Sequence, residues 1–477
     1  MRFVMGSEIS NRVFTKEDFI AFKNACHDEL EYIRSLFEKG SEIFSNKYRI
    51  GYELEVCILD SDNLPNPINH KILDDIHSPL FTNELAKYDL EINGNVFELD
   101  GDAPKRLDED LQSLWNKAQS SAEKYHAQLG LFGVLPSLKL EHFNQALYQS
   151  EMHRYTLVSQ RMQELRHEPI KVLFHGEDEV SLEKDDVMLE ALGTSLQIHL
   201  QVPFDEAVAY YHASLLASVI LTGFAANSSL VLEKRAWHES RIAIFEQSVD
   251  TRDKERREHG DEKRVHFAHG YIDSWMDLFE QNNAFKIIFA DVKERPVSDL
   301  HHFSLHNGTI WRWIRPILDS DKDGKHTLRL ELRSLPSGPT LIDTQTNIWF
   351  FVGLIKGLVN AKTDLRQIPF DTLKDDFYNV ARTGLDTEFH EPIYGKKVSL
   401  KEWILSDGIA LTKEGLSSFG IVDTDQFLNI IEERTSSEQN GAQWQLEHFK
   451  KYNSIPKLME DYMHHAKQNI PIHQWSL

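Results

Sequence analysis

Residues 49–59 read RIGYELEVCIL, and this stretch decides the fold because its side chains alternate between two faces. A period of two residues is typical of a β-strand. The apolar side chains on one face are those of Tyr52, Leu54, Val56 and Ile58. The other face carries Glu53, Glu55 and Cys57. The pattern predicts a strand with one face in a core and an acidic opposite face.

Two further stretches repeat this alternation with different polar groups. Residues 194–202, TSLQIHLQV, pack leucine, isoleucine and valine on one face and place on the other Ser195, Gln197, His199 and Gln201. Residues 327–333, TLRLELR, pack three leucines and place on the opposite face Arg329, Glu331 and Arg333. The first strand thus offers acids, the second an imidazole with amides, and the third an acid between two arginines. Together these groups would suit metal ions and phosphate groups.

Each strand also allows a plainer interpretation. Two glutamates about 7 Å apart on a strand suit two neighbouring Mg²⁺ ions, but an amphipathic strand with its glutamates in water would look the same. A single histidine such as His199 is more often structural than a ligand. Residues 329–333 would also fit a surface ladder of ion pairs. The residues alone leave these alternatives open.

The order of the expected elements favours an α+β fold over a doubly wound parallel sheet. Strands and helices do not alternate regularly, and the chain contains neither GxGxxG nor GxxxxGK[ST]. We expect a curved, mainly antiparallel sheet with helices packed on its outer side. Apolar spacing predicts a helical lead-in at about 14–40, a helix from 186 to the strand at 194, and a mostly helical part at about 345–477.

Composition and charge limit the partners. The chain has 477 residues, with 75 acidic and 52 basic side chains and a formal charge of −23. This charge disfavours nucleic acids and anionic membranes. Two cysteines, Cys26 and Cys57, and an N-terminus without an apolar leader predict a cytoplasmic protein without a signal peptide. The longest apolar stretch, 213–226, is too short to span a bilayer, so we expect no membrane segment.

Taken in order, the motifs resemble a known family. They read GYELEVCILD, NELAKYDLEIN, TSLQIHLQV, NSSLVLEKRAWHESR and LELRSLPSGPT, followed by YNVARTGLD and NGAQWQL. Their order and spacing, from about residue 48 to 446, resemble the second glutamate–cysteine ligase family, which includes bacterial carboxylate–amine ligases. The resemblance implies a glutamine synthetase-like catalytic fold, with residues 1–477 as a single catalytic domain.

The resemblance also implies roles for individual residues. The metal ligands would be Glu53, Glu55, Glu84, Glu91, His199 and Glu331. Without the resemblance, Glu84 would read as a residue on a helix surface. The residues that contact the nucleotide would be Gln197, His199 and Arg333, with Gln197 standing where many relatives have a histidine. Arg241 and Arg333 would steady the charge of the substrate and of the transferring phosphoryl group.

The activity that the resemblance implies is amide formation with ATP and Mg²⁺. A small carboxylic acid, glutamate in the named family, would be phosphorylated by ATP, and an amine such as cysteine would attack the acyl phosphate. Two alternatives stay open: a phosphotransferase of the guanidino-kinase type, and a non-catalytic nucleotide-binding regulatory relative. The sequence names neither the amine nor the oligomeric state, so a homo-oligomer is left open. The expected partners are small-molecule substrates.

Overall fold

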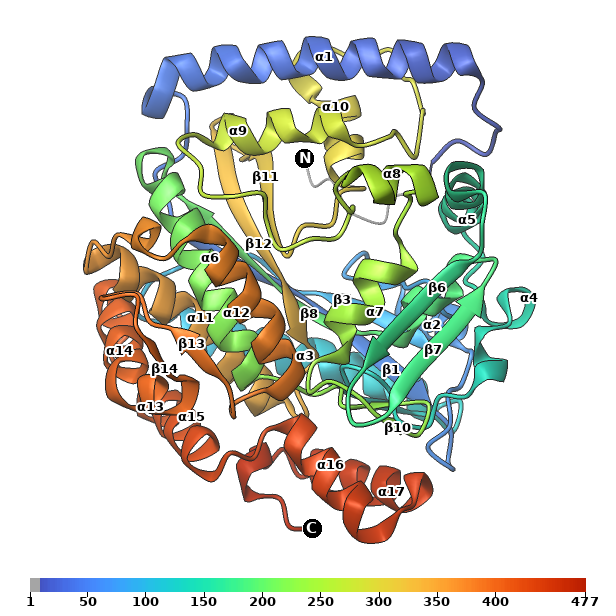
Figure 1. The fold of residues 1–477 in the computed structure, drawn as a ribbon, viewed down its shortest axis with the longest axis vertical. Helices are drawn as coiled ribbons and strands as arrows, with labels where there is room; N and C mark the ends of the chain where they lie inside the picture. The colour runs from blue at the N-terminus through green and yellow to red at the C-terminus, as the bar shows by residue number, and fades with distance from the viewer. Residues whose placement is uncertain (1–8) are drawn as a thin grey trace.

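The computed structural model describes residues 9–477, and its centre is a curved sheet of eight strands (Figure 1). These are β1 (Arg49–Leu59), β2 (Phe81–Asn83), β3 (Asp89–Asn93), β4 (Phe97–Glu98), β5 (Gln128–Gly130), β8 (Ser195–Val202), β11 (Ile314–Ser320) and β12 (His326–Pro336). They follow the order β11–β12–β8–β1–β3–β2, while β4 and β5 pair with the two ends of β1. All of these pairings are antiparallel, which confirms the expected sheet.

The pairing register gathers the polar side chains on one face of the sheet. His199 of β8 lies opposite Gly51 of β1 and Glu331 of β12. Glu55 of β1 lies opposite Glu91 of β3. Residues that pair across neighbouring strands point to the same face, because side chains alternate along each strand. The polar groups of the three strands anticipated from sequence therefore share the inner face.

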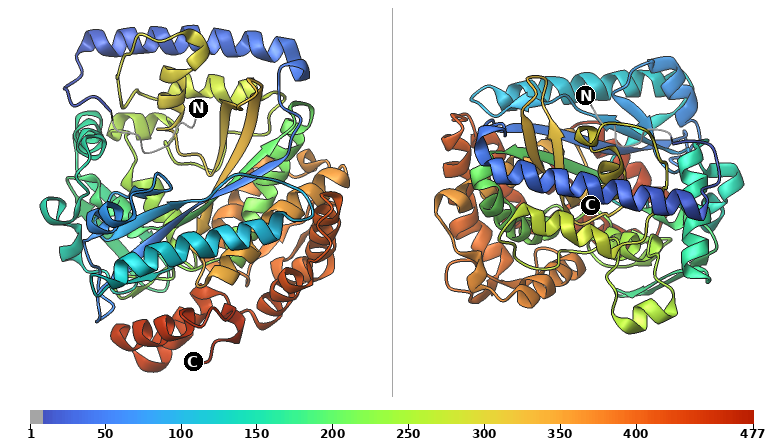
Figure 2. Two further views of the ribbon diagram at one scale, coloured as in Figure 1. Left: turned by 180° about the vertical axis from the view of Figure 1, so that it is seen from behind. Right: turned by 90° about the horizontal axis from the view of Figure 1, so that it is seen from above.

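The opposite, outer face is apolar and holds the main core. Helices α3 (Ala103–Glu123), α6 (Ala207–Phe224) and α11 (Leu341–Asn360) cover it, and Figure 2 shows α3 crossing the back of the sheet. Tyr52 of β1 donates a hydrogen bond to Asp110 of α3 at 2.9 Å. Thr222 of α6 donates one to Ser334 of β12 at 3.0 Å. The expected helical layer on the outer side is confirmed.

The inner face is covered as well. Residues of α5 (His153–Arg166) and α7 (Ser240–Ser248) face it across a cavity, and α10 (His301–Asn307) lies at its upper end. Helix α1 (Lys16–Lys39) runs over α10 (Figure 1). Glu29 of α1 is 2.7 Å from Nδ1 of His302 and accepts a hydrogen bond from the backbone of Phe303 at 2.6 Å. These contacts hold α1 against the segment that closes the inner face.

The two expected helical regions are confirmed, and one shorter helix is not. The lead-in is α1, and the C-terminal part continues from α11 through α12 (Phe370–Thr383), α13 (Leu400–Trp403), α14 (Ile409–Ser418), α15 (Asp425–Ser437), α16 (Gly441–Tyr452) and α17 (Ile455–Ala466). The helix expected from 186 is wrong: the segment is a 3₁₀ helix, η3 (Val187–Leu192). Asp186 caps its start and Gly193 follows its end, and so short a segment favours the tighter turn.

The remaining elements are short and lie around this frame. Three two-stranded hairpins are β6 (Ile170–His175) with β7 (Glu179–Lys184), β9 (Leu230–Val231) with β10 (Lys234–Arg235), and β13 (Glu388–His390) with β14 (Lys397–Ser399). The other α-helices are α2 (Asn69–Ile76), α4 (Gln145–Tyr148), α8 (Lys254–His259) and α9 (Trp275–Glu280). One hydrophobic cluster extends from Leu30 to Trp475. The assignment of residues 1–477 to a single catalytic domain stays a prediction.

The apolar stretch around α6 is longer than the sequence suggested. The segment Phe204–Phe224 is long and apolar enough to cross a membrane, which corrects the expectation that the stretch is too short. However, 83% of its most apolar window is buried inside the molecule. It packs against α11, α12 and β12, so its composition is explained by its place in the core.

Candidate active site

Glu53, His199 and Glu331 form the first of two groups of candidate metal ligands on the inner face. One ligand atom of each lies within 4.8 Å of the others, because β1, β8 and β12 are neighbours. His199 Nε2 is 3.1 Å from Oε1 of Glu53, and neither ring nitrogen has a well-formed hydrogen bond to the described residues. A buried imidazole without such partners is costly. A metal ion held by the first group would relieve that cost.

Two arginines flank the first group. Arg315 donates from Nε and Nη2 to the two oxygens of Glu331 at 2.5 and 2.8 Å. Arg333 donates to Glu331 and to the side-chain oxygen of Gln197. Burial alone would raise the pKa of Glu331, but the charges of both arginines outweigh it and hold that pKa below its usual range. This end of the site combines an ionised acid with guanidinium groups that suit phosphate.

Glu55, Glu84 and Glu91 form the second group, again with ligand atoms within 4.8 Å of one another. Glu55 accepts hydrogen bonds from the backbone and hydroxyl of Ser195 at 2.6 and 2.7 Å, and from Gln197 at 3.1 Å. These donors are all neutral. The second group is therefore held in place by dipoles rather than by opposite charges.

The other two members of the second group come from β2 and β3. Glu91 of β3 accepts hydrogen bonds from Thr82 and Asn93, both at 2.7 Å. Glu84 directly follows β2 and lines a cavity, so its interpretation as a helix surface residue is wrong. The register of β2 against β3 places Thr82 opposite Glu91. The short β2–β3 pair thus brings both acids to Glu55.

Burial raises the pKa of each acid of the second group. The pKa of Glu55 is raised, that of Glu84 lies well above its usual range, and that of Glu91 rises to about 7. Glu190 of η3 is a fourth acid beside them, and burial together with the charge of Glu55 raises its pKa to about 8. Within residues 9–477 no lysine or arginine forms an ion pair with any of the four acids. A divalent cation would supply the missing positive charge.

Glu53 of the first group and all three acids of the second group line one cavity of about 150 Å³. Its charged and amide side chains include those of Glu53, Glu55, Glu84, Glu91, Glu190, Gln197, Arg154, Arg315 and Arg333. Its apolar wall contains Leu85, Val158, Val187, Phe245, Val249, Phe289 and Trp311. A wall that combines apolar side chains with convergent charged groups is characteristic of a small-molecule site.

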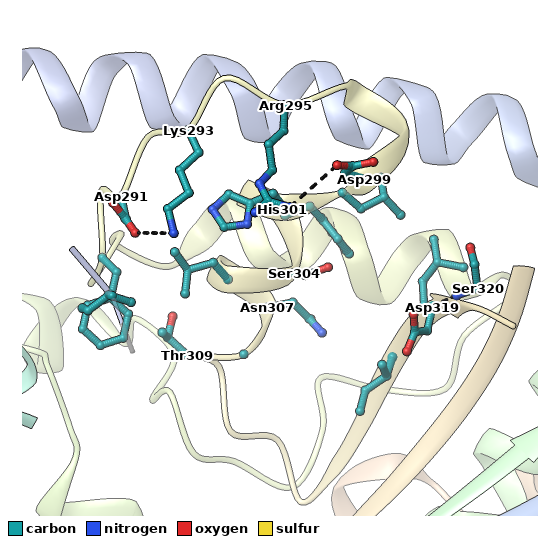
Figure 3. Close-up of a pocket in the computed structure, with 18 of the residues that line it drawn as sticks. Asp291, Lys293, Arg295, Asp299, His301, Ser304, Asn307, Thr309, Asp319 and Ser320 are labelled. Carbon is teal, nitrogen blue, oxygen red and sulfur yellow. Dashed lines mark hydrogen bonds and ion pairs between the residues drawn. The ribbon is translucent and has the colours of Figure 1, made fainter. Parts of the chain in front are cut away.

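A second cavity of about 250 Å³ continues beneath α10 (Figure 3). The two cavities share lining residues, among them Phe289, Gly308 and Arg315, so they adjoin at the β11 end of the inner face. Arg329 of β12 lines the second cavity, and its Nε is buried without a hydrogen-bond partner in the described chain. The two cavities give one elongated space along the inner face, with Arg315 at the junction.

Arg241 of α7 is near both groups but lines neither cavity. It donates from Nε to the carbonyl of Thr194 at 3.2 Å and from Nη2 to the carbonyl of Leu335 at 3.0 Å and to that of Arg333. Its Nη1 has no hydrogen-bond partner among the described residues. The guanidinium thus ties the start of β8 to the end of β12. In this region the pairing of β12 with β8 shifts register, as a β-bulge does.

The cysteines lie outside this chemistry. Both Cys26 and Cys57 are free thiols, and Cys57 is buried. Burial raises the pKa of Cys57 well above its usual value, with a further contribution from the charge of Asp89. A thiol with such a pKa is a poor nucleophile at neutral pH. This environment indicates that Cys57 is a structural thiol.

Sequence reasoning missed two charged residues of the site. Arg315 lies in the stretch HNGTIWRWIRP, and only its register opposite Glu331 reveals its partner. Glu190 is the single acid in the apolar run VMLEAL, and a lone acid among buried residues was the available signal. Both depend on pairings between segments distant in the chain, which spacing along one strand does not show.

Comparisons with solved structures give the fold context. A glutamate–cysteine ligase from Francisella tularensis, solved in complex with AMP, has 11% identity and a TM-score of 0.55, with 89% of each chain covered. A bifunctional glutathione synthetase from Pasteurella multocida has 10% identity and a TM-score of 0.43, covering 88% of this chain and 53% of that one. The complex of the prokaryotic ubiquitin-like protein Pup with its ligase PafA has 11% identity and a TM-score of 0.36, covering 88% of this chain and 72% of that one. The first shows a shared fold.

The family comparison is decisive. A search of curated proteins gave no match. The model of glutamate–cysteine ligase family 2, in contrast, matches residues 49–461, which is most of the chain. That range contains both ligand groups and the two arginines that flank the first. The chain therefore belongs to glutamate–cysteine ligase family 2 and is a carboxylate–amine ligase that forms C–N bonds.

Proposed function

We propose that this protein uses ATP and Mg²⁺ to join the side-chain carboxylate of glutamate, or of a similar small acid, to an amine. The observation that carries the proposal is the pair of ligand groups on one face of the sheet, beside a cavity that four of their acids line, with Arg315 and Arg333 bonded to Glu331 of the first group. The AMP bound to the ligase from Francisella tularensis, which has the same fold, supports the nucleotide.

The ligand sets fit magnesium ions. Each group offers carboxylate oxygens within 4.8 Å of one another, and the first adds an imidazole nitrogen. Mg²⁺ favours such oxygen ligands and keeps water positions that phosphates can take. The ions would be held by Glu53, His199 and Glu331 in the first group and by Glu55, Glu84 and Glu91 in the second. When bound, they neutralise phosphate charge as the phosphoryl group is transferred.

The arginines indicate the direction in which ATP lies. Arg315 and Arg333 flank the first group and would face the phosphates, together with Gln197 and His199. The adjoining cavity beneath α10 would then take the nucleoside, beside the buried guanidinium of Arg329. Together the two cavities span the inner face. If the phosphates lie at Arg315, the space beside the second group remains for the carboxylate and the amine.

The reaction would proceed in two transfers. An oxygen of the substrate carboxylate attacks the γ-phosphorus, and ADP leaves, which gives an acyl phosphate. The amine then attacks the acyl carbon, and phosphate leaves with that carboxylate oxygen. Arg333 would stabilise the charge on the transferring group. Arg241 lines neither cavity, so its charge would support the same group from behind the cavity wall, while Nε and Nη2 hold the backbone of β8 and β12.

The direct test is release of ADP and phosphate by the purified protein with Mg²⁺, glutamate and a panel of amines that includes cysteine. We expect release to depend on both the carboxylate and the amine, with equal ADP and phosphate and with the mass of an amide product. A phosphorylated product without free phosphate would instead indicate a kinase. No response to any carboxylate and amine would contradict the proposal. A cytoplasmic location, where ATP and Mg²⁺ are abundant, is part of the proposal.

A further inference from the structure

We propose that Glu190 is a specificity-determining residue that binds the ammonium group of the amine substrate. The inference rests on the proposed ligase function and deepens it, because it assigns the amine end of the cavity. The ligand of Glu190 would be a protonated primary amine. Glu190 contacts that nitrogen and orients it beside the second group.

The local structure holds Glu190 firmly at the cavity wall. It belongs to η3, in which the other five residues are all buried: Val187, Met188, Leu189, Ala191 and Leu192. Its backbone carbonyl accepts a hydrogen bond from Gly193 at 3.2 Å, just before β8 begins. Two residues further on, Ser195 binds Glu55. The turn therefore has little freedom, and its single polar side chain lines the cavity that contains the second group.

Glu190 is not a member of either metal-ligand group. The atoms of Glu55, Glu84 and Glu91 lie within 4.8 Å of one another, and Glu190 is not part of that set. In the described chain its carboxylate also makes no hydrogen bond or ion pair. The charges of Arg333 and Arg241 reach Glu190 only at longer range, where they lower its pKa less than burial raises it. An acid at a cavity wall without an ion pair or a place in a metal-ligand group can accept a cationic ligand.

The distribution of charge places the ammonium at this end rather than at the other. The first group has Arg315 and Arg333 at hydrogen-bond distance, and these would repel an ammonium group. When ionised, the three acids of the second group and Glu190 carry four negative charges, so a single divalent ion would leave an excess of two. A protonated amine beside Glu190 would offset that excess.

The remaining wall indicates what else the amine carries. Near the acids the cavity is lined by apolar side chains that include Val187, Phe245 and Trp311. Arg315 and Arg333 are already bonded to Glu331. A small amine with an apolar substituent therefore meets complementary surfaces at both its nitrogen and its body.

The test compares Glu190→Gln with the wild type, using methylamine, propylamine and cysteine as amine probes. Hydroxylamine serves as a separate probe, because at mildly alkaline pH it is uncharged and traps acyl phosphates as hydroxamates. We expect the variant to keep hydroxamate formation and the KM for ATP, while the KM for the best amine probe rises at least about tenfold. Glu190→Asp, which keeps the charge, should recover part of the loss.

Asp185→Asn is the matched control, since Asp185 is an exposed acid in the same segment. It should leave every parameter unchanged. An unaltered amine KM in Glu190→Gln, or an equal loss of hydroxamate and amide, would overturn the assignment. So would fewer bound Mn²⁺ ions in that variant than in the wild type, which would make Glu190 a metal ligand. Hydroxamate formation without use of any of the three amines would also contradict it, whereas no hydroxamate in the wild type would refute the ligase proposal itself.

Discussion

The two ligand groups share one face of one sheet, yet their surroundings are opposite. In the first group, Glu331 is bound by the buried Arg315 and the half-buried Arg333, and its pKa is held low against the effect of burial. In the second group, the acids accept hydrogen bonds from neutral donors only, and burial raises the pKa of each. The first group contains ion pairs to the protein's own cations, whereas the acids of the second group form no ion pair with the described residues and feel Arg241 and Arg333 only at longer range.

This difference explains how one small cavity can hold unlike partners. The first group, with Arg315 and Arg333, suits the negative charge of phosphates. The second group suits cations: a metal ion and, beside Glu190, an ammonium group. The sheet thus sets the order of the reactants, from nucleotide through transferring phosphoryl group to amine.

The largest expected effect is that of Glu331→Gln. The change leaves the buried Arg315 and the half-buried Arg333 without a carboxylate, so we expect a loss of about 3–5 kcal/mol in the free energy of unfolding. Ligase turnover should fall by about 10²–10³-fold or more. Urea unfolding and ADP release measure the two effects. Glu98→Gln is the control, because Glu98 pairs with Lys47 at the surface and should change stability by only about 0.5 kcal/mol.

The same change in the second group should have the opposite effect on stability. Glu84 has no cationic partner in the described chain, and burial raises its pKa well above the usual range. We expect Glu84→Gln to unfold without metal at the same or a higher urea concentration than the wild type, although turnover is lost. A loss of several kcal/mol in the metal-free protein would show that the two groups do not differ as described.

The pH dependence of stability should follow the second group. Because Glu91 and Glu190 have folded-state pKa values of about 7 and about 8, above those of an unfolded chain, the folded protein binds more protons at neutral pH. The metal-free protein should therefore lose stability as the pH rises through about 7 to 8. Mg²⁺ should reduce this loss, since it replaces the protons. Thermal unfolding with EDTA and with Mg²⁺ across this range gives the comparison, and a metal-free protein that gains stability over it would contradict the account.

The smallest expected effect is that of Ser195→Ala. The hydroxyl of Ser195 is one of three donors to Glu55, at 2.7 Å, and the backbone and Gln197 bonds remain. We expect a decrease of about tenfold in metal affinity, with little change in the fold. Titration with Mn²⁺ would measure it. An effect as large as that of Glu84→Gln would mean that the neutral donors matter more than the acids they orient.

The sequence predicted the strands of the site better than the pairs between them. Alternation along 49–59, 194–202 and 327–333 is a local property, and it correctly placed Glu53, His199 and Glu331 on polar faces. Glu84 depended on the family resemblance, because it follows a three-residue strand with no pattern of its own. Arg315 reaches Glu331 only through the register of β11 and β12. Glu190 reaches the cavity only through the position of η3. Local periodicity carries no information about such distant contacts.

The central claim is that a carboxylate is activated by phosphoryl transfer and then captured by an amine. The most direct measurement uses glutamate with both side-chain carboxylate oxygens labelled with ¹⁸O, together with ATP, Mg²⁺ and the best amine probe. Mass spectrometry of the products should find one labelled oxygen in the released phosphate and the other in the amide. Phosphate without label, or label that stays entirely in the carboxylate, would contradict the account.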